Sequence, residues 1–143
     1  MSVLRAGPAD LDRLARIHAR AFPQPWTAGD IAALGGAALA EAEAGMILVR
    51  TAAGEAEVLT VAVVPEARGR GLGRRLVEAG LDAARQAGAD LIFLEVAEDN
   101  APARRLYAAC GFSETGRRPG YYHRPGEPAV DALVMSRALN TGP

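Results

Sequence analysis

Apolar residues in the first third of the chain recur at the spacing of helix faces. A first amphipathic helix is expected over residues 9–22, where the side chains of one face are Leu11, Leu14, Ala15, His18, Ala21 and Phe22. The two prolines that follow end this helix, because proline cannot donate the backbone hydrogen bond of a continuing helix. A second helix is expected to begin at Thr27, which forms an approximate capping box with Asp30, while Trp26 and Ile31 occupy the positions of a hydrophobic staple.

After Gly35-Gly36 the spacing of the apolar residues changes from helical to extended. Three strands are expected at residues 39–44, 46–51 and 57–64. A helix is expected over residues 71–87, and the nearly continuous apolar run at 91–96 is typical of a strand buried on both faces. A short helix then begins at its N-cap Asn100 and runs through Cys110, and two more strands are expected at residues 121–122 and 130–135. This order predicts an α/β fold with a mixed sheet.

The size and composition of the chain indicate one globular domain. With 143 residues, of which 50% are hydrophobic and 23% charged, residues 1–143 are expected to share one core. A net charge of −1 offers no basic surface for nucleic acid. The sequence has no apolar run that could span a membrane, its first residues do not resemble a signal peptide, and its single cysteine excludes an intramolecular disulfide. We therefore expect a cytoplasmic protein that does not bind membranes.

The residue types also exclude some kinds of chemistry. All 16 basic residues are arginine, so neither a Schiff-base lysine nor a catalytic lysine base can be present. The two histidines and the cysteine are scattered without the spacing of a zinc site, so we expect no metal. We interpret His18 and Cys110 as core residues, from their place on apolar helix faces, and His123 as a residue of a solvated loop.

A glycine-rich turn after the third strand is the clearest candidate for a binding site. Residues 61–74 read Val-Ala-Val-Val-Pro-Glu-Ala-Arg-Gly-Arg-Gly-Leu-Gly-Arg, which is a strand, a turn and the start of a helix. Glycine lets the backbone approach a ligand closely, and the free amides at a helix start attract anions. Arg68, Arg70 and Arg74 add positive charge. The pattern favours a phosphate-binding loop, although a tight turn with solvated arginines would have the same composition.

A dinucleotide-binding loop is one alternative for this turn. That fold needs Gly-x-Gly-x-x-Gly directly after its first strand and an acidic residue at the end of the second. Gly69, Gly71 and Gly73 do not have this spacing, and about 60 residues precede the segment. Glu95 does end the next expected strand, so the alternative is weakened but stays open.

The other alternative is a resemblance that covers most of the chain. Residues 68–73 resemble the Arg/Gln-x-x-Gly-x-Gly/Ala pyrophosphate loop of the GCN5-related N-acetyltransferases (GNAT), and residues 91–96 and 100–112 are similar to the rest of that family's core. The resemblance implies a mixed, mostly antiparallel sheet flanked by helices, with acetyl-CoA in the cleft between two splayed parallel strands. By the same resemblance, the residues that contact acetyl-CoA are Val61, Ala62, Val63, Arg68, Gly69, Arg70, Gly71, Leu72, Gly73, Arg74 and Asn100.

Within this superfamily the chain resembles the RimI-type ribosomal-protein-alanine N-acetyltransferases. The narrower resemblance rests on Pro25-Trp26, Leu94-Glu95-Val96, the segment 100–112, and Arg117-Arg118 followed by Tyr121-Tyr122. It implies acetyl transfer from acetyl-CoA to the N-terminal α-amine of a protein, with a ribosomal protein that begins with alanine as the acceptor. Acetylation of another protein or of a small amine, and a non-enzymatic CoA-binding module, are the alternatives.

Two residues are expected to move protons. Glu95 ends an apolar row on one face of its strand, where burial would suit it to accept a proton near neutral pH. RimI-type enzymes place their general base at the position of Glu95. The family pattern Asn-x-x-Ala-x-x-x-Tyr, matched by Asn100, Ala103 and Tyr107, assigns to this tyrosine the protonation of the departing thiolate. From the pattern alone, a solvent-exposed Glu95 and a purely structural Tyr107 remain alternatives.

Acceptor recognition is expected on loops beside the far end of the cleft. By the resemblance, three aromatic residues lie there: Trp26, Tyr121 and Tyr122. Four acids are expected near them: Glu41, Glu43, Glu98 and Asp99. An N-terminal peptide with a small first residue followed by basic residues would suit such a lining. A helix staple for the tryptophan and a solvated rim for the acids are the alternatives.

Overall fold

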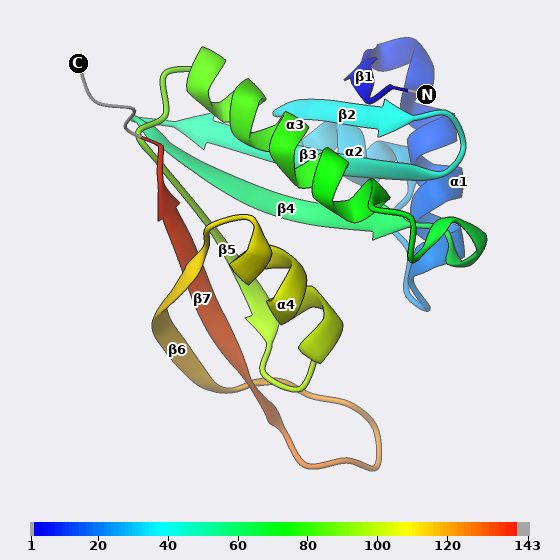
Figure 1. Ribbon diagram of the computed structural model, residues 1–143. Coiled ribbons are helices and arrows are strands. Elements are labelled where there is room, and N and C mark those ends of the chain that lie inside the picture. The colour runs from blue at the N-terminus through cyan, green and yellow to red at the C-terminus, as the bar shows by residue number, and fades with distance from the viewer. Residues whose placement is uncertain (1, 140–143) are drawn as a thin grey trace.

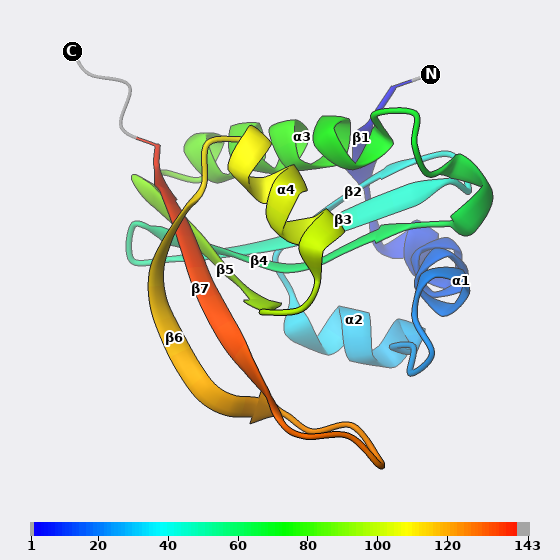
Figure 2. The same cartoon turned by 60° about the horizontal axis from the view of Figure 1, so that its bottom comes forward.

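Seven strands form one mixed sheet with helices on both faces (Figure 1). This computed structural model describes residues 2–139. The strands are β1 (Leu4–Ala6), β2 (Ala37–Glu41), β3 (Gly45–Ala52), β4 (Glu55–Val63), β5 (Leu91–Ala97), β6 (Ser113–Tyr122) and β7 (Val130–Ala138). The helices are α1 (Leu11–Ala21), α2 (Ala28–Leu34), α3 (Leu72–Gln86) and α4 (Ala101–Ala109), with single 3₁₀ turns at Pro8–Asp10 and Pro65–Ala67. Figure 2 shows α3 and α4 on one face of the sheet and α1 and α2 on the other.

The mixed, mostly antiparallel sheet predicted from the sequence is confirmed. The strands follow the order β1-β2-β3-β4-β5-β7-β6, and within the described residues β4 and β5 are the one parallel pair. The four predicted helices are also present. Thr27 caps α2 as predicted, since its hydroxyl accepts a hydrogen bond from the Asp30 amide (3.1 Å) while the Asp30 carboxylate accepts one from the Thr27 amide (2.9 Å).

The two edge strands differ from the sequence prediction. β1 was not expected, and β6 begins at Ser113 and not at Tyr121. Most residues of β6 are exposed, and its Gly, Arg and Pro residues lack the alternation that marks a strand with one buried face. Pairing with β7, from Ser113 opposite Ser136 to Tyr122 opposite Val130, holds it in the sheet. Beside β1, which forms the other edge, β2 runs from Ala37 to Glu41 and so begins and ends earlier than expected.

β5 is not buried on both faces, contrary to the expectation. Ile92, Leu94 and Val96 are buried, whereas the alternate residues, Phe93 and Glu95 among them, are half-buried. The buried set packs in the core beneath α3. The other face is less covered because α1 packs on β3 and β4 rather than on β5. β5 also continues past Glu95 to Ala97, so this carboxylate does not end the strand.

β4 and β5 separate along their length. They are paired only where Glu55–Glu57 lies beside Leu91–Phe93, at the start of both strands. Beyond that point the two strands diverge, as Figure 1 shows. They are the splayed parallel strands that the resemblance predicts, and residues from the C-terminal halves of both line the second cavity described below.

A β-bulge determines which β4 side chains face the gap. Leu59 is the extra residue, since the register with β3 shifts at this point. As a result, Val58 belongs to the core beneath α3, whereas Ala62 belongs to the core beneath α1. Val61 and Val63 pack toward α3 and α4, the side on which the first cavity lies.

Candidate active site

A cavity of about 550 Å³ lies beside the end of β4, the turn after it, the start of α3 and one face of α4. Most of the residues predicted to bind acetyl-CoA line it: Val61, Val63, Arg68, Gly69, Gly71, Leu72, Gly73 and Asn100. The structure therefore gathers residues from two separate segments of the sequence around one space.

The glycine-rich turn has a backbone shape that favours glycine. Gly69 and Gly71 have φ angles of +78° and +79°, in the left-handed region. Gly71 is the N-cap of α3 and, having no side chain, cannot cap the first amides of that helix. Arg68 lies beside them, and its Nε donates a hydrogen bond to the Val63 carbonyl (3.0 Å). Helix amides beside a guanidinium suit an anionic group.

Three of the predicted cofactor-binding residues do not line this cavity. The Ala62 side chain is buried on the opposite side of β4, against α1. Arg74 forms an ion pair with Glu78 one helical turn away (3.6 Å). Arg70 is exposed, and its carbonyl accepts a hydrogen bond from Arg75 (3.2 Å). Their contacts with a cofactor stay predictions, which for Ala62 concern the backbone alone.

A second cavity, of about 690 Å³, adjoins the first. Its walls are the end of α1 with the segment before α2, the C-terminal parts of β4 and β5, and the end of β6 with the residues after it. Five residues line both cavities: Phe22, Val61, Asn100, Ala103 and Tyr107. We call these five residues the shared wall. A ligand in one cavity can thus meet a ligand in the other, which is the geometry that group transfer requires.

Glu95 lies in the second cavity and is held in an ion pair. Its side chain is 24% exposed, so the burial predicted for it is only partial. The Arg118 Nη1 donates hydrogen bonds to both carboxylate oxygens, at 2.9 and 3.1 Å. Arg118 comes from β6 and reaches across β7, and its guanidinium lies 4.3 Å from the centre of the Tyr121 ring. Among the described residues that line this cavity, Glu95 is the one carboxylate.

Tyr107 belongs to the shared wall. Its ring packs edge-on against Phe112, with 5.9 Å between the ring centres. Burial raises the pKa of the Tyr107 phenol to about 12, so the hydroxyl stays protonated at neutral pH. Asn100 lies nearby and caps α4 as predicted, because its Oδ1 accepts a hydrogen bond from the Ala103 amide (3.2 Å).

Two of the three aromatic residues predicted to recognise the acceptor line the second cavity. These are Trp26 and Tyr122. Tyr121 does not line it; its side chain is exposed and packs edge-on against Tyr122, with 5.1 Å between ring centres. Burial raises the pKa of the Tyr122 phenol, and the negative charge of Glu95 adds to this effect.

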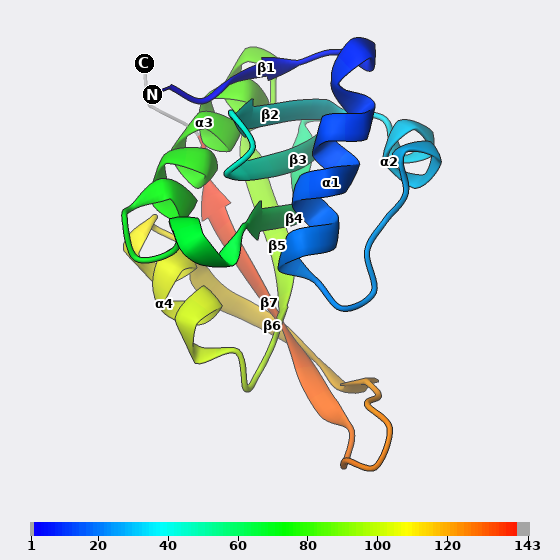
Figure 3. The same cartoon turned by 90° about the vertical axis from the view of Figure 1, so that its right-hand side faces the viewer.

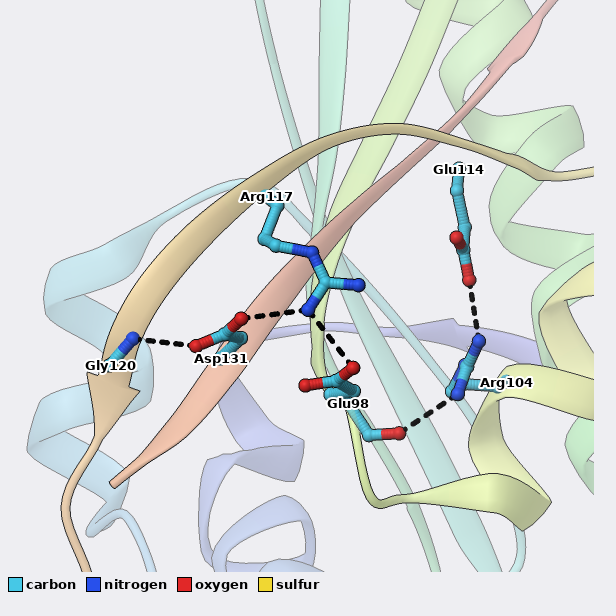
Figure 4. Close-up of polar contacts among 6 residues, drawn as sticks. All are labelled: Glu98, Arg104, Glu114, Arg117, Gly120 and Asp131. Atoms are coloured by element: carbon cyan, nitrogen blue, oxygen red, sulfur yellow. Dashed lines mark hydrogen bonds and ion pairs between the residues drawn. The ribbon is translucent and has the colours of Figure 1, made fainter. Parts of the chain in front are cut away.

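A network of polar contacts holds β6 against the loop that follows β5 (Figure 4). Arg117 on β6 contacts Glu98 (3.0 Å) and Asp131 (2.7 Å), and the second oxygen of Asp131 accepts a hydrogen bond from the Gly120 amide (2.8 Å). Arg104 on α4 donates to the Glu98 carbonyl (3.0 Å). These contacts fix the segment that carries Arg118 and the tyrosine pair.

The four acids predicted beside the acceptor do not line the second cavity. Each already has an arginine partner: Glu41 with Arg75, Glu43 with Arg16, Glu98 with Arg117 and Asp99 with Arg124. The Arg124 guanidinium lowers the pKa of Asp99, and Arg16 lowers that of Glu43. Because their charge is paired, they do not support the expected preference for a basic acceptor peptide.

Two residues of the second cavity or its rim were not predicted to be functional. His18 lines the cavity, and Arg118 pairs with Glu95. The contact between His18 and Trp26 could have been anticipated from one feature of the sequence. His18 lies eight residues before Trp26, on the apolar face of its helix. Arg118 lies 23 residues from Glu95, and only the strand order β5-β7-β6 brings the two together.

Within residues 2–139, no group of three or more His, Cys, Asp or Glu side chains is arranged to hold a metal ion. In the same part of the chain, no helix has both the length and the apolar character needed to cross a membrane.

Comparisons with known proteins agree with this geometry. The chain is 40% identical over 144 residues to an uncharacterized protein of Mycobacterium leprae, and the matched region covers 91% of this chain and 38% of that protein. It is 43% identical over 90 residues to N-alpha-acetyltransferase RimI of Mycobacterium tuberculosis, covering 63% of this chain and 53% of that protein. The chain therefore spans about half or less of these two relatives.

A solved structure matches nearly the whole chain. The crystal structure of the ribosomal-protein-S18-alanine N-acetyltransferase from Escherichia coli superposes with a TM-score of 0.87 at 28% sequence identity, covering 99% of this chain and 96% of that one. Residues 10–112, which include both cavities' helices and the glycine-rich turn, match the family described as acetyltransferase (GNAT). On the match of this segment, the chain belongs to the acetyltransferase (GNAT) family.

Proposed function

We propose that the protein transfers an acetyl group from acetyl-CoA to the N-terminal α-amine of a protein, and that the acceptor is a ribosomal protein that begins with alanine. The observation that carries the proposal is the shared wall, where a half-buried tyrosine separates the glycine-rich turn from a cavity that contains a carboxylate. The likeness to the Escherichia coli enzyme supports the choice of acceptor. A ribosomal acceptor would place the reaction in the cytoplasm.

The first cavity fits acetyl-CoA. The turn with Arg68 and the first amides of α3 would hold the pyrophosphate. The edge of β4 near Val61 and Val63, from which β5 has separated, would offer backbone groups to the amides of the pantetheine arm. When bound, acetyl-CoA would supply the acetyl group as a thioester and a thiolate as the leaving group.

Glu95 would accept the proton of the acceptor amine. A protein α-amine has a pKa of about 7.7–8.0, so much of it is protonated at neutral pH and cannot attack. Glu95 is the carboxylate that the second cavity offers, and it can take this proton directly or through water. Arg118 keeps the carboxylate in a fixed place through two hydrogen bonds.

Tyr107 would supply a proton to the departing sulfur. Because burial raises the pKa of its phenol to about 12, the hydroxyl stays protonated at neutral pH and can donate a hydrogen bond, and then its proton, to the sulfur as the C–S bond breaks; the phenolate, which is the stronger base, then recovers a proton from solvent. Glu95 and Tyr107 come from β5 and α4, so the base and the acid approach the shared wall from different elements. Such an arrangement lets one group remove a proton while the other delivers one.

The second cavity suits a peptide better than a small free amine. Phe22, Trp26 and Tyr122 give the cavity an aromatic lining, and the exposed Tyr121 packs on Tyr122 outside that lining. Exposed aromatic side chains around a cavity are typical of sites that bind a partner chain. Val61 and Ala103, two residues of the shared wall, have short side chains, and we expect the first residue of the acceptor to be small beside them.

The proposal is tested by locating the acetyl group on defined acceptors. The purified chain is incubated with acetyl-CoA and a peptide that begins with alanine and also contains an internal lysine, and fragment masses identify the acetylated nitrogen. We expect acetylation of the α-amine. The same peptide with a blocked N-terminus is the control, and it should not react.

Other outcomes separate the alternatives. Acetylation of the internal lysine, or faster acetylation of small amines, would leave an acetyltransferase with a different acceptor. Tight binding of acetyl-CoA by calorimetry without transfer to any amine would favour a non-enzymatic CoA-binding module. Binding of NADH tighter than that of CoA would contradict the assignment of the first cavity.

A further inference from the structure

His18 is a buried histidine that the proposed proton transfers do not use. Its side chain is 3% exposed, and it lies on α1 in the wall of the second cavity. Its ring contacts two aromatic side chains of the segment after α1. The ring of Trp26 is stacked on it, with 4.7 Å between centres and 14° between planes, and the ring of Phe22 lies 4.5 Å away at 35°.

Both ring nitrogens of His18 have polar partners. The Trp26 amide donates a hydrogen bond to Nδ1 (3.1 Å), and Nε2 lies 3.4 Å from the Thr60 hydroxyl on β4. A backbone amide can only donate, so Nδ1 must carry a lone pair. In the neutral ring the proton is then on Nε2, which can donate it to Thr60. Protonation of Nδ1 would place two donors face to face and break the bond to Trp26.

Residue 18 thereby holds both ends of the segment 22–26. The Phe22 amide donates to the His18 carbonyl (3.0 Å), and the Trp26 amide donates to the His18 ring. Two prolines, which have no amide hydrogen, occupy positions 23 and 25. Phe22, Pro23, Gln24 and Trp26 all line the second cavity, so the placement of this wall depends on His18.

The ionisable groups around His18 do not compete for its ring nitrogens. Within residues 2–139, the ring makes hydrogen bonds to Trp26 and Thr60 alone. The ionisable side chains that share its cavity come from β5, α4 and the end of β6: Glu95, Tyr107, Tyr122, His123 and Arg124. The charged side chains on the elements packed against α1 each have another partner. The pairs are Asp30 with Thr27, Asp10 with Arg13, Arg50 with Glu57 and Glu66 with Arg20. Burial lowers the pKa of His18, which favours the neutral ring.

We propose that neutral His18 is a positioning residue that holds segment 22–26 as the acceptor-facing wall, and that its protonation releases this wall. The proposal rests on the function proposed above, because it concerns how the acceptor is bound. It assigns to His18 no part in proton transfer. Loss of the neutral ring should weaken acceptor binding, while acetyl-CoA, held by the turn and α3, should bind almost as before.

Steady-state kinetics with two substitutions test this role. His18→Phe keeps an aromatic ring but cannot accept the Trp26 hydrogen bond, and His18→Asn keeps an acceptor at the position of Nδ1. We expect His18→Phe to raise KM for the alanine peptide about five- to ten-fold, the effect of one lost hydrogen bond, with kcat and the Kd of acetyl-CoA within about two-fold of wild type. His18→Asn should recover part of the loss. As the pH falls below the ordinary histidine value of about 6.5, KM should rise more in the wild type than in the Asn variant, because the acceptor amine is protonated to the same extent for both.

Fluorescence gives a second readout that does not depend on catalysis. Trp26 is the one tryptophan of the chain, and its emission reports on whether its indole stays stacked on the His18 ring. Release of the segment should therefore change the intensity and wavelength of wild-type emission on acidification, with a midpoint below about 6.5, the ordinary histidine value. The transition should be absent in His18→Phe and preserved in His123→Gln, which removes the other histidine.

Several results would overturn the proposal. It is wrong if both His18 variants retain the wild-type KM, if kcat falls while KM is unchanged, or if the fluorescence transition persists in His18→Phe. A wild-type protein that acetylates no peptide would refute the proposed acceptor, and the acceptor role of His18 would fall with it. A wild-type protein that is active, with variants that do not differ from it, refutes the role of His18 alone.

Discussion

Replacing Tyr107 by phenylalanine removes one hydroxyl and keeps the ring that packs against Phe112. The shared wall keeps its shape, so acetyl-CoA should bind with a Kd within about two-fold of wild type, whereas a missing proton donor should lower kcat by ~10²–10⁴-fold. Stopped assays of acetylated peptide give kcat, and calorimetry gives the Kd. A variant with the wild-type kcat would show that this tyrosine is structural.

The raised pKa of Tyr107 gives the same substitution a second, thermodynamic consequence. The pKa of this phenol is about 12 in the folded chain and 10 in a free tyrosine side chain, and the difference corresponds to about 3 kcal/mol. Because the folded value is the higher one, this stability is fully present below pH 10 and is lost as the pH rises toward 12. The free energy of unfolding should therefore fall between about pH 10 and 12 in the wild type, and less steeply in Tyr107→Phe.

Measurements of stability and of activity should both show that the Tyr107 hydroxyl is protonated up to about pH 10. Urea unfolding at several alkaline pH values measures the stability difference, and initial rates up to about pH 10 measure activity. The Tyr107 hydroxyl should stay protonated over that range, so it should cause no alkaline decline in kcat. The inference that burial holds the proton on this hydroxyl would be refuted by one result. The kcat of the wild type would decline with a midpoint at pH 10 or below, and the low kcat of Tyr107→Phe would not.

Three other substitutions test the site and the fold. Glu95→Gln should lower kcat by ~10²–10⁴-fold with acetyl-CoA binding retained, and the defect should shrink above about pH 8, where the acceptor amine is already neutral. Gly71→Val forces a β-branched residue to φ +79° and should weaken acetyl-CoA binding about ten-fold or more by calorimetry, whereas Gly29→Ala in α2 should not. Gly36→Ala would place a Cβ 2.4 Å from the Val49 carbonyl oxygen at φ +85°, so thermal unfolding should show a loss of about 2 kcal/mol or more, while Gly7→Ala, with no atom within 4 Å, should change little. Unaltered rates, affinity or Tm, respectively, would contradict these expectations.

Local patterns in the sequence were sufficient to predict the helices and the central strands. The capping box at Thr27 and Asp30 and the N-cap at Asn100 depend on contacts within three residues, and both are present. The edge strands depend on contacts far away. β6 is a strand because β7 pairs with it, and its own composition of Gly, Arg and Pro gives no sign of this.

The predictions about the candidate site also depend on whether the contacts are local in the sequence. The glycine-rich turn is local, and most of its predicted residues line one cavity. The surroundings of Glu95 are not local, because Arg118 reaches it only through the order β5-β7-β6. For this reason the sequence predicted a buried carboxylate, and the structure has a partly exposed ion pair. The contact between His18 and Trp26 was missed because it needs the segment 22–26 to fold back on α1.

The divergence of β4 and β5 also bears on how the molecule opens. Figure 3 shows β1–β4 with α1 and α2 on one side of the divergence and the β6–β7 arm projecting from the other. Three residue pairs join the two halves of the sheet at β4 and β5, against seven between β5 and β7. Only the short edge strand β1 is joined by as few pairs, so among the interior strands this junction is the least cross-linked, and local separation of the two halves should begin there. A ligand that spans the gap braces both halves, and at a hundred times its Kd it would add about 2.7 kcal/mol to the stability of the whole.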